Sequence, residues 1–183
     1  MRIALDVDDV LARFMQAYCD KFETDKYPKR LESKIITRNV HQKLQHDREF
    51  WLSLEVKHRP NFIPELYCTK RVNPKEYTKK WLEINGFPKR PVYQMVYQKG
   101  NKATMIKGRC DVLIDDSLSN VLKAMNSGLP AILMIDDWNA DFDYPYKVNS
   151  LDIEEISYKE QQQEYASKSH YCVTPPKDMA TTD

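Results

Sequence analysis

Short apolar runs that do not alternate with polar residues recur along this chain of 183 residues. Five of them have strand character, and the second is the weakest: residues 3–7, 65–69, 92–97, 112–115 and 131–135. Continuous apolar runs are typical of strands that are buried on both faces of a parallel sheet. This feature favours a parallel sheet that is covered on both faces.

Segments with helical patterning separate these runs. Asn73 is expected as the N-cap and Pro74 as the first turn of a helix that covers residues 75–85 and stops at Gly86. Two further helices are expected over residues 102–108 and 117–126. Strands that alternate with helices predict an α/β fold, namely a Rossmann-like parallel sheet of about five strands flanked by helices.

The stretch after the first strand breaks this alternation. Residues 14–22 and 40–54 have helical character, and a highly charged segment over 24–37 lies between them. We expect a small, mostly helical cap inserted between the first two strands. The predicted organisation is a core over 1–13 and 61–156, a cap over 14–60, and a polar helix and tail over 157–183.

Composition excludes several functional classes. The chain has 28 Lys+Arg against 27 Asp+Glu, so its net charge of +1 argues against a partner such as duplex nucleic acid. Four scattered glycines exclude both the dinucleotide-binding and the P-loop glycine motifs. The sequence has neither a signal-peptide pattern nor a membrane-spanning run, and its four cysteines form no CxxC pair. We expect a cytoplasmic protein without a membrane partner.

Carboxylates follow two of the expected strands. Asp6 and Asp8 end the first strand, and Asp115 and Asp116 end the fourth. Ligands of open parallel sheets bind beyond the carboxyl ends of the strands. Two carboxylates about 4 Å apart repel by roughly 4 kcal/mol at an effective dielectric constant of 20, so protonation or a cation is required there. Oxygen ligands favour a hard ion such as Mg²⁺, and Mg²⁺ accepts phosphate oxygens.

Other residue types complete the pattern at this edge. Thr69, Lys70 and Arg71 end the second strand, and Lys102 begins the helix before the fourth strand. An aspartate at a strand end can act as a nucleophile, and a carboxylate two residues later can move a proton. A lone DxD at a strand end is usually a turn or a helix cap, and Thr69 alone indicates nothing, so the specificity lies in the order of the motifs, their strand context and the lysine between the last two.

In this order the motifs resemble those of haloacid dehalogenase (HAD) superfamily phosphatases, and within them the 5'(3')-deoxyribonucleotidase family. The resemblance covers roughly residues 1–156, and the cap is matched only loosely. The motifs that carry it are Asp6-Val7-Asp8-Asp9-Val10-Leu11-Ala12-Arg13-Phe14, Cys68-Thr69-Lys70, Lys102, Ile114-Asp115-Asp116, and a turn at Asp136-Asp137-Trp138-Asn139.

The resemblance implies a role for each charged residue. Asp6 would attack phosphorus, and Asp8 would protonate the leaving oxygen and then activate water. Asp6, the backbone carbonyl of Asp8, and Asp115 would hold Mg²⁺. Asp116 would act on the ion through water or orient Lys102, and Lys102 would neutralise the charge of the phosphoryl group.

The resemblance also implies contacts with the substrate. Thr69 and the amides after it would hold the phosphoryl oxygens, with Lys70 as a second cation. Phe14 matches an aromatic residue that stacks on the base, and Trp51 beside Phe50 is expected as a second wall. The alternative is that Phe50 and Trp51 are part of the cap's own core.

The chain departs from the family pattern at several positions. Asp9 stands where the family usually has glycine, and we expect its side chain to face away from the site. Lys70 replaces a serine, and Arg13 replaces an acidic residue. Lys99 and Lys107 are rivals for the role of the third-motif lysine.

The leading hypothesis is a Mg²⁺-dependent phosphomonoesterase that hydrolyses (deoxy)nucleoside monophosphates through an aspartyl-phosphate. One alternative is a HAD phosphatase for another small phosphate ester or for polynucleotide 3' ends. Another is a nucleotide- or phosphate-binding protein without turnover. The expected partner is a small phosphate monoester. The sequence does not decide between a monomer and a homodimer.

Overall fold

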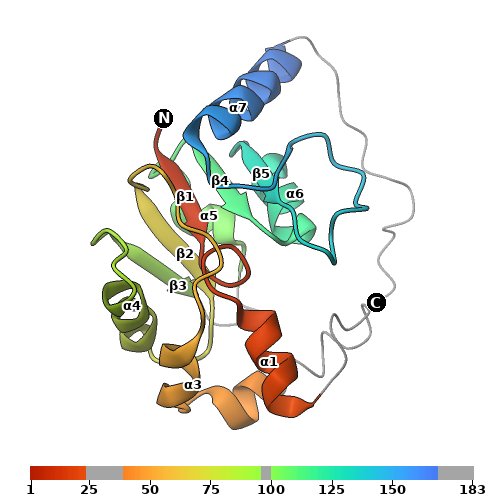
Figure 1. The fold of residues 1–183 in the computed structure, drawn as a ribbon. Coiled ribbons are helices and arrows are strands. Elements are labelled where there is room, and N and C mark those ends of the chain that lie inside the picture. The colour runs from red at the N-terminus through yellow and green to blue at the C-terminus, as the bar shows by residue number, and fades with distance from the viewer. Residues whose placement is uncertain (24–38, 96–99, 169–183) are drawn as a thin grey trace.

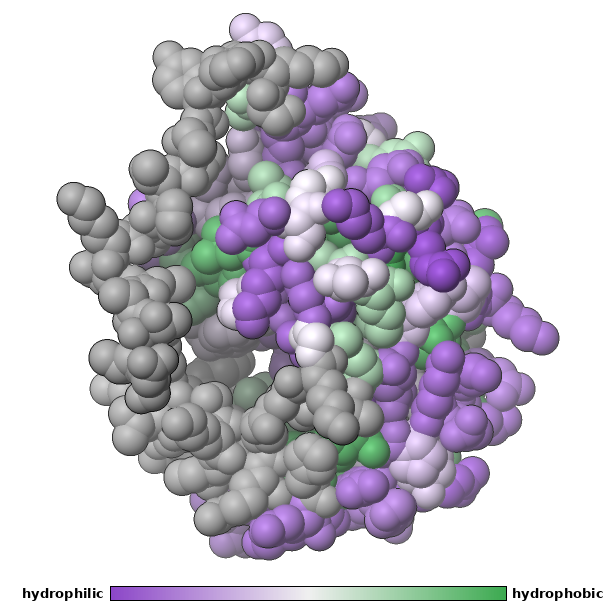
Figure 2. Space-filling model, turned by 180° about the vertical axis from the view of Figure 1, so that it is seen from behind, coloured by the Kyte–Doolittle hydropathy of each residue, from purple (hydrophilic) through white to green (hydrophobic). Residues whose placement is uncertain are grey.

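The computed structural model describes residues 1–23, 39–95 and 100–168. The expectations for the charged segment 24–37, for Lys99 and for the tail over 169–183 lie outside these residues. Among the described residues, no helix is both long and apolar enough to cross a membrane. The described residues on the face drawn in Figure 2 are mostly hydrophilic, with hydrophobic residues in small patches between them.

The centre of the molecule is a sheet of six strands in the order β3-β2-β1-β4-β5-β6, and every neighbouring pair is parallel. The strands are β1 (Ile3–Asp6), β2 (Leu66–Lys70), β3 (Val92–Met95), β4 (Val112–Asp115), β5 (Ala131–Met134) and β6 (Lys147–Val148). The structure confirms the predicted α/β Rossmann-like sheet and its five strands. The two-residue β6, which pairs with β5, was not predicted.

Helices cover both faces of this sheet (Figure 1). Ala4 and Leu5 are neighbours in β1 and point to opposite faces, as alternation along a strand requires. On the side of Ala4 pack α5 (Lys102–Ile106) and α6 (Leu118–Asn126). On the side of Leu5 pack α4 (Lys75–Ile84) and the start of α7 (Ile153–Lys168). Double coverage explains why the strands are continuously apolar.

The start of α4 differs in detail from the prediction. Its N-cap is Pro74 and not Asn73, and no side chain caps the helix by a hydrogen bond. The side-chain amide of Asn73 instead donates to the carbonyl of Pro74. Gly86 has a φ of +70° just after the helix, which fits the predicted stop.

The segment between β1 and β2 is helical and lies beside the carboxyl ends of the strands. Helix α1 (Phe14–Phe22) has the predicted bounds. The segment 40–54, for which helical character is predicted, divides into a π-helical turn, η2 (Val40–Leu44), and a separate helix, α3 (Arg48–Ser53). The break occurs at Asp47, whose carboxylate accepts from the amide of Phe50 and caps α3. Figure 1 shows α1 and α3 together near the end of β1.

The two chain segments that connect this cap to the core lie next to each other. Ala12 and Val56 form an antiparallel bridge. The amide of Arg13 donates to the carbonyl of Glu55 (2.9 Å), and the amide of Lys57 donates to the carbonyl of Leu11 (2.7 Å). The cap therefore enters and leaves the core through two adjacent chain segments that are hydrogen-bonded to each other.

Candidate active site

Three carboxylates meet at the carboxyl edge of the sheet. Asp6 ends β1 and Asp115 ends β4, and these two strands are hydrogen-bonded neighbours. One oxygen each of Asp6, Asp115 and Asp116 lie within 4.8 Å of one another. Asp6 is 4% exposed and Asp115 is fully buried. The strand order thus brings together three of the acidic residues that the sequence singled out.

Lys102 sits between two of these carboxylates. Its Nζ lies 2.6 Å from Oδ2 of Asp6 and 2.6 Å from Oδ2 of Asp115. Lys102 is the first residue of α5, and the side chain of Asn101 caps this helix by accepting from the amide of Ala103. The rival Lys107 is exposed and donates to the carbonyl of Ser127. The geometry therefore favours Lys102 over Lys107 as the lysine of the site.

Burial sets the electrostatics of this cluster. It raises the pKa of Asp6 to about 8, with Asp115 and Asp8 acting in the same direction and Lys102 against it. Burial, followed by Asp115 and Asp6, raises the pKa of Asp116 well above its usual range. Burial also opposes the charge of Lys102, but Asp115 and Asp6 outweigh it and raise the pKa of Lys102. The raised pKa values of Asp6 and Asp116 favour their protonated forms, so Lys102 alone does not stabilise all three carboxylates as anions.

Asp8 is held beside this cluster by two residues from the β2 region. The hydroxyl of Thr69 donates to Oδ2 of Asp8 (3.1 Å). Nη2 of Arg71 donates to Oδ1 at 2.6 Å, and Nε lies within hydrogen-bond distance of both oxygens. The Asp8 side chain is 20% exposed, whereas Arg71 and Thr69 are buried. The sequence places Arg71 at the end of this strand but predicts no pairing with Asp8, which lies 63 positions away.

Lys70 reaches the same edge through an asparagine. Its Nζ donates to Oδ1 of Asn120 (2.7 Å), and the amide nitrogen of Asn120 donates to Oδ1 of Asp115 (3.0 Å). Burial, with the nearby charge of Lys102, lowers the pKa of Lys70. Asn120 was also missed by sequence reasoning: it lies on the first turn of α6, five residues after Asp115, where this turn faces the strand end.

Asp9 occupies the position at which the family usually has glycine. Its backbone is left-handed, with a φ of +57°, which is the conformation that glycine adopts at least cost. Its Oδ1 accepts from the amide of Met15 (3.0 Å), so the side chain caps α1, and its carbonyl accepts from Nζ of Lys57. Burial raises the pKa of Asp9 to about 7, against the hydrogen bond from Met15. The Asp9 side chain thus holds the first turn of α1. Lys57 also pairs with Asp136, and these two contacts connect the cap to the core.

The two aromatic residues expected at the substrate lie against each other. Phe14 and Trp51 are stacked with ring centroids 5.6 Å apart and are 6% and 1% exposed. Trp51 donates from Nε1 to the carbonyl of Leu44 (2.7 Å), and Phe50 contacts both rings edge-on. In this conformation the rings form the interior of the cap. A base could stack on Phe14 only if Trp51 moved away from it.

The turn after β5 is hydrogen-bonded to the loop that carries Asp116. Asn139 is fully buried, and its amide nitrogen donates to the carbonyls of Asp116 (2.8 Å) and Met134 (2.9 Å). Its carbonyl oxygen accepts from the amide of Asp136. Asn139 therefore ties the strand end of β5 to the loop that carries Asp116.

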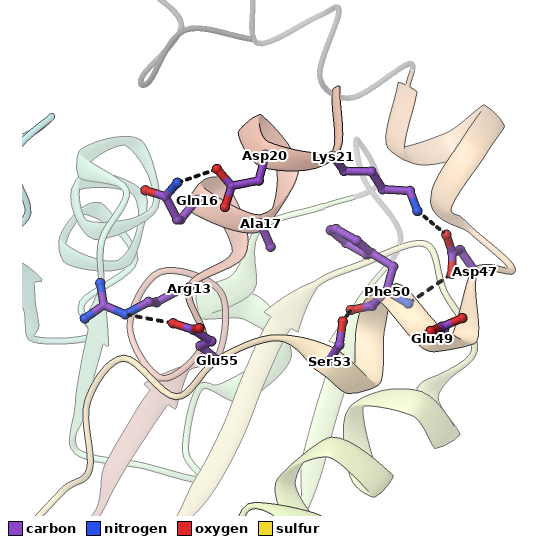
Figure 3. Close-up of a pocket in the computed structure, with 10 residues that line it drawn as sticks. All are labelled: Arg13, Gln16, Ala17, Asp20, Lys21, Asp47, Glu49, Phe50, Ser53 and Glu55. Atoms are coloured by element: carbon purple, nitrogen blue, oxygen red, sulfur yellow. Dashed lines mark hydrogen bonds and ion pairs between the residues drawn. The ribbon is translucent and has the colours of Figure 1, made fainter. Parts of the chain in front are cut away.

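A polar pocket of about 460 Å³ lies on the cap between α1 and α3 (Figure 3). Lys21 pairs with Asp47 across it, and Arg13 faces Glu55 at its other end. The lining residues are Arg13, Gln16, Ala17, Asp20, Lys21, Asp47, Glu49, Phe50, Ser53 and Glu55. None of the strand-end carboxylates lines this pocket, so it is separate from the candidate active site.

The sequence matches no protein-family model, and no curated protein matches it. Two solved structures are similar in the course of the chain. One is a HAD-superfamily hydrolase of subfamily IA, variant 1, from Geobacter sulfurreducens, with 11% identity, a TM-score of 0.49, and coverage of 87% of this chain and 95% of that one. The other is a haloacid dehalogenase-like hydrolase from Streptococcus pneumoniae, with 10% identity, a TM-score of 0.42, and coverage of 86% and 90%. Because both TM-scores lie below 0.5, the chemistry is inferred from the residues of the site.

The fold and the cluster together define an α/β domain with a carboxylate site where the strand order reverses, between β1 and β4, which is where such folds bind ligands. The donor set fits a hard divalent cation: three carboxylates within reach of one ion, with neither histidine nor cysteine among them.

Proposed function

We propose that this chain is a HAD-superfamily phosphatase that hydrolyses phosphate monoesters through an aspartyl-phosphate on Asp6. The observation that carries the proposal is the contact of Lys102 with both Asp6 and Asp115 at the carboxyl edge of the sheet. A nucleophilic carboxylate, a buried cation and further acidic ligands at one strand edge are the parts that phosphoryl transfer needs, because catalysis there is mostly positioning and charge stabilisation.

The residues divide the reaction between them. Asp6 attacks phosphorus, and the bond from phosphorus to the leaving oxygen breaks while Asp8 delivers its proton to that oxygen. Asp8 then takes a proton from water, and the resulting hydroxide attacks the phosphorus of the aspartyl-phosphate. Inorganic phosphate leaves and the Asp6 carboxylate is regenerated. Thr69 and Lys102 hold the phosphoryl oxygens during both steps.

The carboxylates of Asp6, Asp115 and Asp116, with the backbone carbonyl of Asp8, would hold Mg²⁺. When bound, the ion supplies positive charge that offsets the repulsion between Asp6 and the phosphoryl oxygens. Lys102 contributes the same kind of charge from the protein, and Lys70 adds a second cation through its position beside Asn120.

For the substrate we propose nucleoside monophosphates, deoxy forms included. The support is the resemblance of residues 6–14 to the motif of deoxyribonucleotidases, in which the aromatic position corresponds to Phe14. A cap that is anchored beside the carboxyl edge favours a small molecule over a folded macromolecule as substrate.

The test is phosphate release by the purified protein from a panel of 5'- and 3'-nucleoside monophosphates, sugar phosphates and p-nitrophenyl phosphate, with MgCl₂ or with EDTA. We expect release that depends on Mg²⁺ and is fastest with a nucleotide. Quenching during turnover should trap a phosphorylated peptide that contains Asp6. A folded protein that releases phosphate from no member of the panel would overturn the proposal, and fastest release from a sugar phosphate would overturn its nucleotide part.

A further inference from the structure

Arg71 is the residue that holds Asp8, and nothing in the reaction scheme uses it. It directly follows β2, and its side chain is fully buried. Nη2 and Nε both donate to Asp8, at 2.6 Å and 2.9 Å for the two shortest contacts. This is the two-pronged pairing of a guanidinium with a carboxylate, which fixes the orientation of the carboxylate as well as its position.

Arg71 is itself fixed from several sides. Nη1 donates to the hydroxyl of Thr78 on α4 (3.2 Å), and that hydroxyl donates to Gln94 on β3 (2.8 Å). The guanidinium lies 4.8 Å from the ring centroid of Trp51, which belongs to α3 of the cap. Arg71 therefore joins Asp8 of the core to an aromatic residue of the cap.

The burial of Arg71 limits what it can do. A fully buried guanidinium does not reach a substrate, and a buried ion pair is in general weak support for stability because desolvation offsets the attraction. What the pairing does provide is a defined direction for Asp8. Thr69 adds a hydrogen bond on Oδ2, and the exposed fifth of the Asp8 side chain is left for the reacting groups.

We propose that Arg71 is a positioning residue that directs the Asp8 carboxyl group toward the leaving-group oxygen, with Trp51 of the cap packed against it. This inference rests on the proposed phosphatase function. Its consequence is a dependence on the leaving group. An alkoxide must be protonated as it leaves, whereas p-nitrophenolate leaves readily without a proton, so loss of Asp8 alignment slows the first case far more than the second.

The experiment compares kcat/KM on a nucleoside monophosphate and on p-nitrophenyl phosphate, because this parameter reports the step in which the leaving group departs. For Arg71→Met we expect a fall of roughly 100-fold with the nucleotide, the lower range for loss of a proton donor, and of at most about threefold with p-nitrophenyl phosphate. KM should not rise for either substrate, and with p-nitrophenyl phosphate kcat and KM should fall together, because Asp8 also activates water in the second step. Arg71→Lys, which keeps the charge but not the fork, should lie between wild type and Arg71→Met.

Arg59→Met is the matched control. Arg59 is an exposed arginine that also packs over an aromatic ring, Phe87, with 5.1 Å between its guanidinium carbon and the ring centroid. We expect it to leave both kcat/KM values unchanged. Thermal melting of each variant checks its folding, and if Arg71→Met does not fold, the comparison is made with Arg71→Lys.

The outcomes separate the two proposals. An equal fall with both substrates would overturn the positioning role, and so would a rise in KM alone, which would make Arg71 a binding residue. A wild-type protein that is inactive on both substrates would overturn the phosphatase function, and the role of Arg71 with it. Trp51→Leu should reproduce the leaving-group dependence of Arg71→Met at a few-fold level.

Discussion

The carboxyl edge of the sheet and the cap show two different ways of placing a side chain. At the edge, Asp6 and Asp115 are neighbours because β1 and β4 are hydrogen-bonded, so the backbone alone sets their distance. In the cap, Phe14 and Trp51 meet because side chains from α1 and α3 pack together. Isosteric replacement of a carboxylate at the edge should therefore remove chemistry and leave the fold, whereas substitutions in the cap should change packing and substrate affinity together.

Asp6→Asn should have the largest effect. The amide is not a nucleophile, so kcat should fall by roughly four orders of magnitude or more. The amide oxygen can still accept the hydrogen bond from Val7, so the melting temperature should stay close to that of wild type. Asp111→Asn, at the opposite edge of the sheet, is the control and should keep full activity. Substantial activity in Asp6→Asn would remove the edge from the mechanism.

Lys102→Met tests the charge balance of the edge. Without Lys102, two buried carboxylates face each other, and removal of one partner of a buried ion pair typically costs about 3–5 kcal/mol. Urea unfolding without metal should show a loss of this order, and added MgCl₂ should recover part of it. The exposed Lys107→Met is the control. A loss that MgCl₂ leaves unchanged would contradict a cation site at these carboxylates.

Phe14→Leu asks what the cap rings do. The loss of stacking on Trp51 should destabilise the fold by about 1 kcal/mol. If the ring also contacts a base, KM for nucleoside monophosphates should rise about tenfold, while KM for a small alkyl phosphate stays constant. Phe87→Leu, which removes a similar stack on Trp81 in the core, should lower stability alone. A KM for nucleotides that does not change would assign Phe14 to cap packing only.

His58→Gln should have the smallest effect and concerns the segment between cap and core. Burial, with the charges of Lys57 and Arg13, lowers the pKa of His58. Below about pH 6.5 the unfolded chain binds a proton that the native chain resists, so His58 makes native stability fall as the pH drops from 7 toward 5. Urea unfolding at both pH values should show a flatter dependence in His58→Gln. The exposed His46→Gln should keep the wild-type dependence, and an unchanged slope in His58→Gln would refute the assignment.

The same contrast explains what could be predicted from the sequence. Non-alternating apolar runs identify five parallel strands, and polar residues at their ends lie together because the ends of parallel strands meet. The strand β6 has only two residues, Lys147 and Val148, and no apolar run marks it. The break between η2 and α3 depends on Asp47 turning back to cap one helix, which the helical pattern over 40–54 does not reveal.

Contacts between side chains that are far apart in the sequence could not be predicted either. Arg71 and Asp8 are 63 positions apart, and their pairing depends on the rotamer of Arg71 and on the packing of Trp51. Asn120 reaches Asp115 only because α6 starts directly beside the strand end. Periodicity and motif spacing contain no information on such contacts.

The bridge between Ala12 and Val56 has a consequence for how such a domain can diversify. The insertion begins and ends at two residues that lie next to each other in space, so it joins the core as a loop whose ends are already held together. The entropy of closing a loop grows only slowly with its length. Residues can therefore be added to or removed from the segment between these two points with little penalty to the sheet, and substrate range can evolve there while the catalytic edge stays constant.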